Sequence, residues 1–254
     1  MGSGKPTIVT FQERNLMSDP VDSRRTFLAL TAAAPAVLAL GSPASAQISD
    51  AIPAALPGEG RAAVGRAISL QADVADPAAV RALFDANEEA FGGVDVVVNN
   101  AGIMNVGPFA QMTDEAFDRM IATNVKGGFN VLREAARRTR DGGRIISLSS
   151  SIINAPPPGT AAYAATKAAQ VHYSSVLSKE LAGRDISVNA IAPGAVDTQL
   201  LRQHGEEALR GIPEQTPLGR LGQPEDIANV IALLCSRDGT WINGGNVFAN
   251  GGLG

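Results

Sequence analysis

The chain has 254 residues, 45% of them hydrophobic, which is enough to bury a sizeable core and excludes global disorder. Its formal net charge of −4 argues against a nucleic-acid partner, because binding to phosphates requires a basic face. The single cysteine, Cys235, excludes an internal disulfide, and the two histidines, His172 and His204, are too few and too far apart to indicate a zinc site.

Residues 17–47 have the features of a bacterial export signal. Arg24 and Arg25 form a twin-arginine pair, an apolar stretch follows over 27–40, and Ala44-Ser45-Ala46 is a small-residue cleavage site. The apolar stretch is shorter than the ~20 residues of a membrane-spanning helix, so no stable membrane insertion is expected. The sequence therefore predicts a leader over residues 1–46, export to the periplasm, and a second unit over residues 47–254.

The same leader also has the order of segments of a degenerate first β-α-β unit. Residues 5–10 and 36–40 are the candidate strands, and residues 23–34 are the candidate helix between them. Under this alternative the segment is retained in the fold and the protein is cytoplasmic.

Strand and helix signals alternate from residue 62 onward. The expected strands are 67–74, 94–102, 144–151, 186–194 and 244–252. One helix begins at Asp76-Pro77, a cap residue followed by proline at the first helical position, and others are expected over 113–138, 161–183 and 224–236. This alternation predicts a single α/β domain with a doubly wound, Rossmann-type parallel sheet, in which ligands bind beyond the carboxyl ends of the strands.

Tyr163 and Lys167 are four residues apart and share one face of the predicted helix 161–183. A free phenol has a pKa of about 10, and a nearby ammonium lowers it, so the pair is suited to proton transfer. The alternative is a surface tyrosine beside a solvated lysine. Ser150 ends the preceding strand and could donate a hydrogen bond to a carbonyl oxygen, although Ser147, Ser149 and Ser151 are rivals by residue type.

With these residues in place, residues 62–254 resemble the short-chain dehydrogenase/reductase family, and within it the 3-oxoacyl-carrier-protein reductase-like group. The resemblance is carried by Asp73-Val74, the NNAG run at 99–102, Asn124 in TNVKGGF, Ser150, Tyr163 with Lys167, and the PGAVDT run at 193–198. Together, in order and at family spacing, these motifs are specific.

The resemblance implies reversible hydride transfer between NAD or NADP and a small carbonyl or secondary alcohol substrate. Tyr163 would be the general acid or base, Lys167 would lower its pKa and hold the nicotinamide ribose, and Ser150 would polarise the substrate carbonyl. Asn124 would hold a water that links Lys167 to solvent, or would simply disturb its helix. A homodimer or homotetramer is also implied, and no metal is.

The resemblance also implies which residues contact the cofactor. Asp73 and Val74 would contact the adenine, Asn100, Ala101 and Gly102 would lie along the cofactor, and the nicotinamide would be lined by Pro193, Gly194, Val196 and Thr198. The loop 195–221 would cover the substrate, and its Leu200, Leu201 and Ile212 indicate an apolar cover.

One family motif is missing from the sequence. The glycine-rich TGxxxGxG turn, which binds the cofactor pyrophosphate, has no counterpart, and the glycine clusters at 2–4 and 58–60 lack the right context. Without the first two strands of the fold, 67–74 would lack a partner and 94–102 would be an exposed edge, so either other residues take their places or the domain is compromised. We expect residues 1–46 to extend away from the core or to lie irregularly across the vacant strand positions. Weak cofactor binding follows, and the alternative function is a non-catalytic or weakly active family member.

Overall fold

The computed structural model describes residues 7–13, 25–30, 47–49, 65–203, 205 and 209–254. Within these residues, the strands form one sheet in the order β3-β4-β1-β2-β5-β6-β7-β8. The bounds are β1 (Thr7–Glu13), β2 (Arg25–Leu30), β3 (Gln47–Ser49), β4 (Gly65–Gln71), β5 (Val94–Asn99), β6 (Thr139–Leu148), β7 (Ser187–Pro193) and β8 (Asn246–Ala249). Strands β2, β5, β6, β7 and β8 are parallel, which confirms the predicted Rossmann-type fold.

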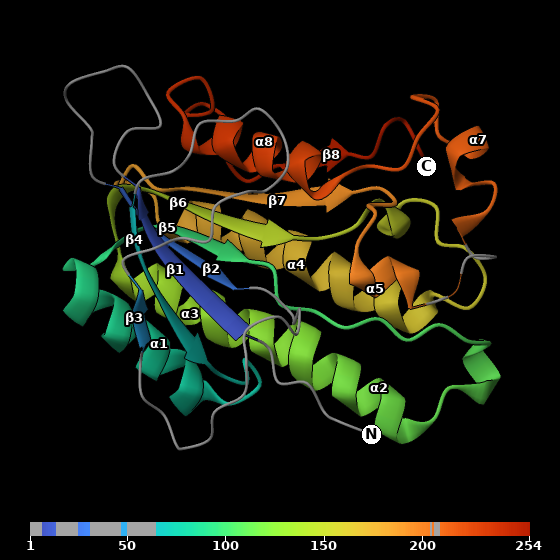
Figure 1. Ribbon diagram of the computed structural model, residues 1–254, viewed down its shortest axis with the longest axis horizontal. Helices are drawn as coiled ribbons and strands as arrows, with labels where there is room; N and C mark the ends of the chain where they lie inside the picture. The colour runs from blue at the N-terminus through green and yellow to red at the C-terminus, as the bar shows by residue number, and fades with distance from the viewer. Residues whose placement is uncertain (1–6, 14–24, 31–46, 50–64, 204, 206–208) are drawn as a thin grey trace.

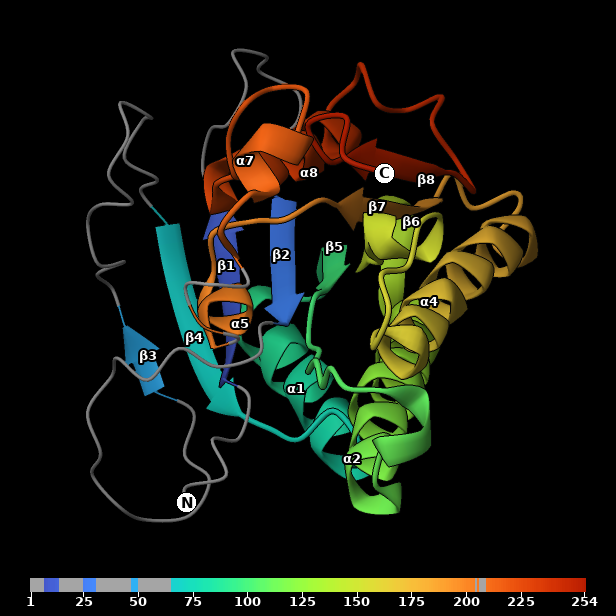
Figure 2. The ribbon, with the colours of Figure 1, turned by 90° about the vertical axis from the view of Figure 1, so that its right-hand side faces the viewer.

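Helices cover both faces of the sheet (Figures 1 and 2). On one face lie α1 (Pro77–Phe91), α3 (Gly128–Arg138) and α4 (Ala161–Glu180), and on the other lies α8 (Pro224–Cys235). Strand β5 supplies Val94 and Val97 to the first core and Val96 and Val98 to the second. A strand buried on both faces needs such a near-continuous apolar run, as the sequence predicted.

The predicted helix over 113–138 is divided into three consecutive segments. They are α2 (Asp114–Met120), the π-helical turn η2 (Ile121–Gly127) and α3. Asn124 lies within η2, in agreement with the expectation that this polar residue disturbs its helix. The remaining short helical elements are η1 (Phe109–Gln111), η3 (Ser151–Ile153), α5 (Gln199–Arg202) and α7 (Ile212–Gln215).

Two N-terminal strands occupy the middle of the sheet, between β4 and β5 (Figure 1). Strand β2 pairs parallel to β5, with Leu30 opposite Asn99, and β1 pairs antiparallel to both β2 and β4. Residues 1–46 therefore do supply strands at the vacant positions, but the expectation that they would extend away from the core or lie irregularly there is wrong for β1 and β2, because both strands pair in regular register with their neighbours. The pairing also satisfies the backbone groups along the edge of β5, which would otherwise be exposed.

The identity of the substituting segments differs from the prediction. Residues 25–30 were predicted to be helical and instead form β2, because a strand here can hydrogen-bond to β5 and a helix cannot. The predicted strand at 5–10 corresponds to β1, but its antiparallel pairing excludes a parallel β-α-β unit built from β1 and β2. The predicted strand at 36–40 lies outside the described residues, and so does the cleavage site at 44–46.

In the part of the chain that the structure describes, no helix combines the length and the apolar character needed to cross a membrane.

Candidate active site

The carboxyl ends of three neighbouring parallel strands meet at one edge of the sheet. Strand β5 ends at Asn99, β6 at Leu148 and β7 at Pro193. The register pairs Asn99 with Ser147, and Ser147 with Ala190. The segments that follow these strands, 100–102, 149–151 and 194–198, therefore emerge at this edge, where the fold binds its ligands.

Tyr163 and Lys167 lie in the first turns of α4, and each is 7% exposed. The Lys167 Nζ atom is 5.7 Å from the centroid of the Tyr163 ring. It also donates a hydrogen bond to the carbonyl oxygen of Leu148, the last residue of β6, at 2.9 Å. The alternative of a solvated surface pair is therefore wrong, because both side chains are buried and the lysine is anchored to the sheet.

Burial changes the acidity of both groups. It lowers the pKa of Lys167 to about 8 and raises the pKa of Tyr163 above that of a free phenol. The second shift is opposite to the expected lowering by the ammonium, because burial penalises the phenolate and Lys167 Nζ is directed to the Leu148 carbonyl. Tyr163 is consequently a neutral phenol near neutral pH, which is the form of a general acid.

The structure distinguishes Ser150 from its rivals. Ser147 and Ser149 are 0% and 3% exposed, and the hydroxyl of Ser149 donates to the carbonyl oxygen of Lys167 at 3.0 Å. Ser151 is 8% exposed, whereas Ser150 is only partly buried. Ser150 precedes η3, and its hydroxyl accepts a hydrogen bond from the Ile152 amide at 3.4 Å. Of these four serines, Ser150 is therefore the one accessible to a substrate.

Asn124 lies beside the Tyr163–Lys167 pair and is 2% exposed. Its side chain accepts from the Ile103 amide at 2.8 Å and donates to the Ile103 carbonyl at 2.8 Å and to Thr166 Oγ1 at 2.9 Å. A β-carbon at Gly102 would lie 3.4 Å from Lys167 Nζ and 3.5 Å from Asn124 Oδ1. The structure thus brings Gly102, Asn124 and Lys167 together, as the resemblance implied.

The residues expected at the adenine differ in what they can offer. Asp73 is exposed, and its carboxylate accepts from the Ala75 amide at 2.9 Å. Val74 is 0% exposed, and a β-carbon at Gly127 would lie 2.5 Å from its Cγ2 atom. The Val74 side chain is therefore committed to the core, and only its backbone is left to contact a ligand.

The remaining cofactor candidates lie after β5 and β7. Asn100 is exposed, while Ala101 and Gly102 are buried. Pro193 ends β7, and a β-carbon at Gly194 would lie 2.8 Å from Asn250 Cα, so glycine permits a close backbone approach there. Val196 forms a bridge with Gly222, and the hydroxyl of Thr198 accepts from the Leu201 amide at 3.4 Å as the cap of α5.

Comparison with known proteins agrees with this geometry. The family model described as Enoyl-(Acyl carrier protein) reductase matches residues 42–254. A short-chain type dehydrogenase/reductase of Picea abies is 43% identical over 192 residues, which cover 74% of this chain and 71% of that protein. The 3-oxoacyl-acyl-carrier-protein reductase FabG of Escherichia coli is 36% identical over 186 residues, or 72% of this chain and 76% of its own.

A solved structure has the same fold and a bound cofactor. The crystal structure of a short-chain dehydrogenase from Burkholderia cenocepacia in complex with NADP matches with a TM-score of 0.68 and 36% identity, covering 72% of this chain and 74% of that one. This chain belongs to the short-chain dehydrogenase/reductase family. It is accordingly an oxidoreductase that uses NAD or NADP.

The described residues of this short-chain dehydrogenase/reductase fit such a cofactor at its two ends. Exposed Asp73 and Asn100 border the carboxyl edge, and the absent side chain of Gly102 leaves a space beside Lys167 Nζ. Residues 31–46, which follow β2 in the sequence, contain a single glycine, Gly41, and lie outside the described residues.

Sequence reasoning missed two polar residues of the site, Thr166 and Gln170. Thr166 Oγ1 accepts from Asn124 Nδ2, and Gln170 contacts both Asn99 and Asn124. Together with Tyr163 and Lys167 they lie on one buried face of α4. The signal that could have found them is this helical spacing, because polar residues rarely follow the buried face of a helix unless they are hydrogen-bonded.

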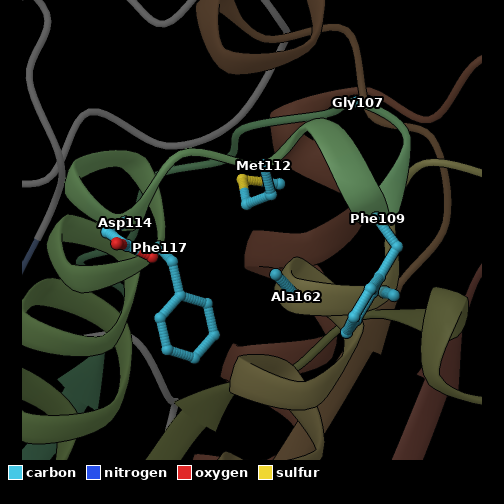
Figure 3. Close-up of a pocket in the computed structure, with 7 residues that line it drawn as sticks. Gly107, Phe109, Met112, Asp114, Phe117 and Ala162 are labelled. Carbon is cyan, nitrogen blue, oxygen red and sulfur yellow. The ribbon is translucent and has the colours of Figure 1, made fainter.

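A cavity of about 160 Å³ opens next to the start of α4 (Figure 3). Phe109 and Phe117 lie on either side of Ala162, which directly precedes the catalytic tyrosine candidate. Met112 lines the cavity and also packs in the cluster that contains Tyr163. The full lining is Gly107, Phe109, Met112, Asp114, Phe117, Ala161 and Ala162.

Proposed function

We propose that this protein reduces the carbonyl group of a small molecule, and in reverse oxidises the alcohol, with Ser150, Tyr163, Lys167 and Asn124 as its catalytic residues. The observation that carries the proposal is the buried Tyr163–Lys167 pair, whose ammonium is 5.7 Å from the phenol ring at the carboxyl edge of the sheet. A tyrosine and a lysine on an ordinary protein surface would be exposed to solvent rather than buried side by side.

The roles of the residues follow from their positions. NADH or NADPH, when bound, supplies the hydride that reaches the carbonyl carbon. Tyr163 donates its phenolic proton to the carbonyl oxygen, and Ser150 donates a hydrogen bond to the same oxygen. The Lys167 ammonium stabilises the phenolate that Tyr163 becomes, and a water held at Asn124 returns the proton by way of Lys167.

The substrate is proposed to have an apolar portion. Leu200, Leu201 and Ile212 are half-buried in the segment that follows β7, which the family resemblance places over the substrate. The test is a panel of aliphatic and aromatic aldehydes and ketones, each assayed with NADPH and NADH by the loss of cofactor absorbance. Turnover that is faster with apolar than with charged substrates is expected, and no turnover with either cofactor would contradict the proposed function.

Cofactor affinity is proposed to be weak. The family's pyrophosphate motif needs several glycines, because backbone amides must approach the phosphates closely. Residues 31–46, which follow β2, contain one glycine. We expect dissociation constants above the micromolar range for both cofactors in a fluorescence titration, with turnover recovered at high cofactor concentration. A micromolar constant for either cofactor would contradict this expectation.

Residues 1–46 are proposed to be retained in a cytoplasmic protein, although their motif is typical of twin-arginine export and of a removable leader. Arg25, half of the arginine pair, is the first residue of β2. Cleavage after Ala46 would remove β1 and β2 from between β4 and β5. Cell fractionation followed by mass spectrometry of the intact chain tests this, and a periplasmic chain that begins at Gln47 would support the leader instead.

The protein is also proposed to form a homodimer or homotetramer. Phe129 on α3 and Val176 on α4 are 46% and 52% exposed, and apolar side chains on neighbouring helices favour association. Light scattering at micromolar concentration is expected to give a multiple of the 26.1 kDa chain mass. A monomer at this concentration would contradict the proposal.

A further inference from the structure

We propose that Gln170 is a positioning residue of this enzyme, whose side-chain amide connects the end of β5 to the π-helical turn η2 and thereby holds Asn124 beside Lys167. The inference rests on the proposed function, because it assigns Asn124 to the proton path. It concerns a residue that is three positions after Lys167 on α4 and 3% exposed.

Both polar atoms of the Gln170 side-chain amide form hydrogen bonds. Its Oε1 atom accepts from Asn99 Nδ2 at 2.9 Å, and its Nε2 atom donates to the main-chain carbonyl oxygen of Asn124 at 2.5 Å. Asn99 is the last residue of β5 and directly precedes the cofactor segment 100–102. One buried side chain therefore links the cofactor edge of the sheet to the backbone of η2.

The π-helical turn makes the Asn124 carbonyl available to this donor. In a regular α-helix that carbonyl would accept from the amide of Gly128, four residues later. Here the Gly128 amide is instead hydrogen-bonded to the carbonyl of Val125. Gln170 supplies a donor in its place, and a buried carbonyl that has a partner stabilises the turn in this form.

Gly128 provides the space for the amide. A β-carbon at this position would lie 2.5 Å from Gln170 Nε2 and 2.7 Å from Gln170 Oε1. Any side chain at residue 128 would therefore displace the amide or the turn. This gives the glycine a function separate from that of its neighbour Gly127, which accommodates Val74.

The position of Asn124 in turn sets the geometry near Lys167. Its side-chain amide holds the backbone of Ile103 and the hydroxyl of Thr166, the residue before Lys167. If Gln170 is removed, both the Asn124 carbonyl and Asn99 Nδ2 lose a buried partner, and η2 is destabilised. Asn124 would then move relative to Lys167, and the proton path would be slowed.

The test compares Gln170→Leu with Ser174→Ala in the full-length protein. Ser174 is a matched control, because it lies four residues further along α4, is 0% exposed, and its hydroxyl has no hydrogen-bond partner among the described residues. Gln170→Leu is expected to lower kcat about tenfold or more, because small displacements of catalytic groups have large effects. The solvent deuterium isotope effect on kcat should rise and KM should change little, since proton transfer becomes more rate-limiting.

A second variant, Gly128→Ala, tests the same inference in case Gln170→Leu does not fold. Gly128→Ala would normally favour a helix, but here its methyl group should displace the Gln170 amide and reproduce the kinetic changes. Amide hydrogen exchange over residues 121–128 should be faster in both variants than in Ser174→Ala, and this measurement does not depend on turnover.

The outcomes separate the inference from the proposed function. Unchanged exchange in Gln170→Leu would overturn the inference whatever the activity. Faster exchange with an unaltered isotope effect would reduce Gln170 to a structural role and would also overturn it. If the wild-type protein turns over no substrate while exchange still depends on Gln170, the proposed function fails and the placement of Asn124 by Gln170 stands.

Discussion

Tyr163→Phe is the substitution that most directly tests the proposed chemistry. The change removes only the phenolic hydroxyl and keeps the ring that packs with Met120 and Ala162. In the described part of the chain, this hydroxyl has no hydrogen-bond partner that the substitution would leave unpaired. The free energy of unfolding should therefore change by less than about 1 kcal/mol.

The catalytic effect of the same change should be large. General acid–base catalysis by a positioned side chain contributes about 10²- to 10⁴-fold. A loss of this size in kcat/KM corresponds to about 2.7 to 5.4 kcal/mol of lost transition-state stabilisation, at ~1.36 kcal/mol per factor of ten. Because burial raises the pKa of Tyr163, the wild-type phenol should remain protonated throughout the neutral range, and carbonyl reduction should not fall there through its ionisation.

The assay follows NADPH absorbance with the best carbonyl substrate of the panel, alongside urea unfolding of each variant. Tyr173→Phe is the matched control, because Tyr173 is the other of the chain's two tyrosines, lies on the same helix, and packs against the core away from Lys167. Near-full turnover in Tyr163→Phe, or an equal loss in both variants, would refute the assignment of Tyr163 as the proton donor.

Three further predictions concern the lysine and one glycine of the site. Burial lowers the pKa of Lys167 from 10.5 to about 8. Between pH 8 and pH 10.5, Lys167 is therefore protonated in the unfolded chain but largely neutral in the folded one. Because the unfolded chain binds more protons over this range, the contribution of Lys167 to the free energy of unfolding rises with pH. Lys167→Met should lack this rise in urea unfolding, and an identical pH dependence in both proteins would contradict the argument. Lys167→Ala should lower kcat for carbonyl reduction below pH 8, because the phenolate that Tyr163 becomes loses its cationic neighbour; an unchanged rate at these pH values would show that the ammonium does not act on Tyr163. Gly127→Ala should reduce the free energy of unfolding by about 1–3 kcal/mol, because its β-carbon would lie 2.5 Å from Val74 Cγ2. Gly107→Ala is the control, because a β-carbon at Gly107 would have open space around it. Equal stability of the two variants would exclude the contact with Val74 as a cause of destabilisation.

The sequence alone determined the family, its class of reaction and most of the fold after residue 62. The spacing of Tyr163 and Lys167 places them on one helical face wherever that helix packs, and the apolar run of β5 can only be satisfied between two covered faces. These features are local, because helical periodicity and strand burial are expressed within a few consecutive residues.

Long-range pairing and burial were decided only by the tertiary structure. Residues 25–30 have an apolar pattern that suits a helix or a strand, and their pairing with β5, whose residues lie far along the chain, makes them β2. Ser150 could be separated from its neighbouring serines only by exposure, and Gln170 could be connected to Asn124 only once α4 was packed on η2. The physical reason is the same in each case: hydrogen bonds between distant segments, and the burial that makes them necessary, have no signature within a short stretch of sequence.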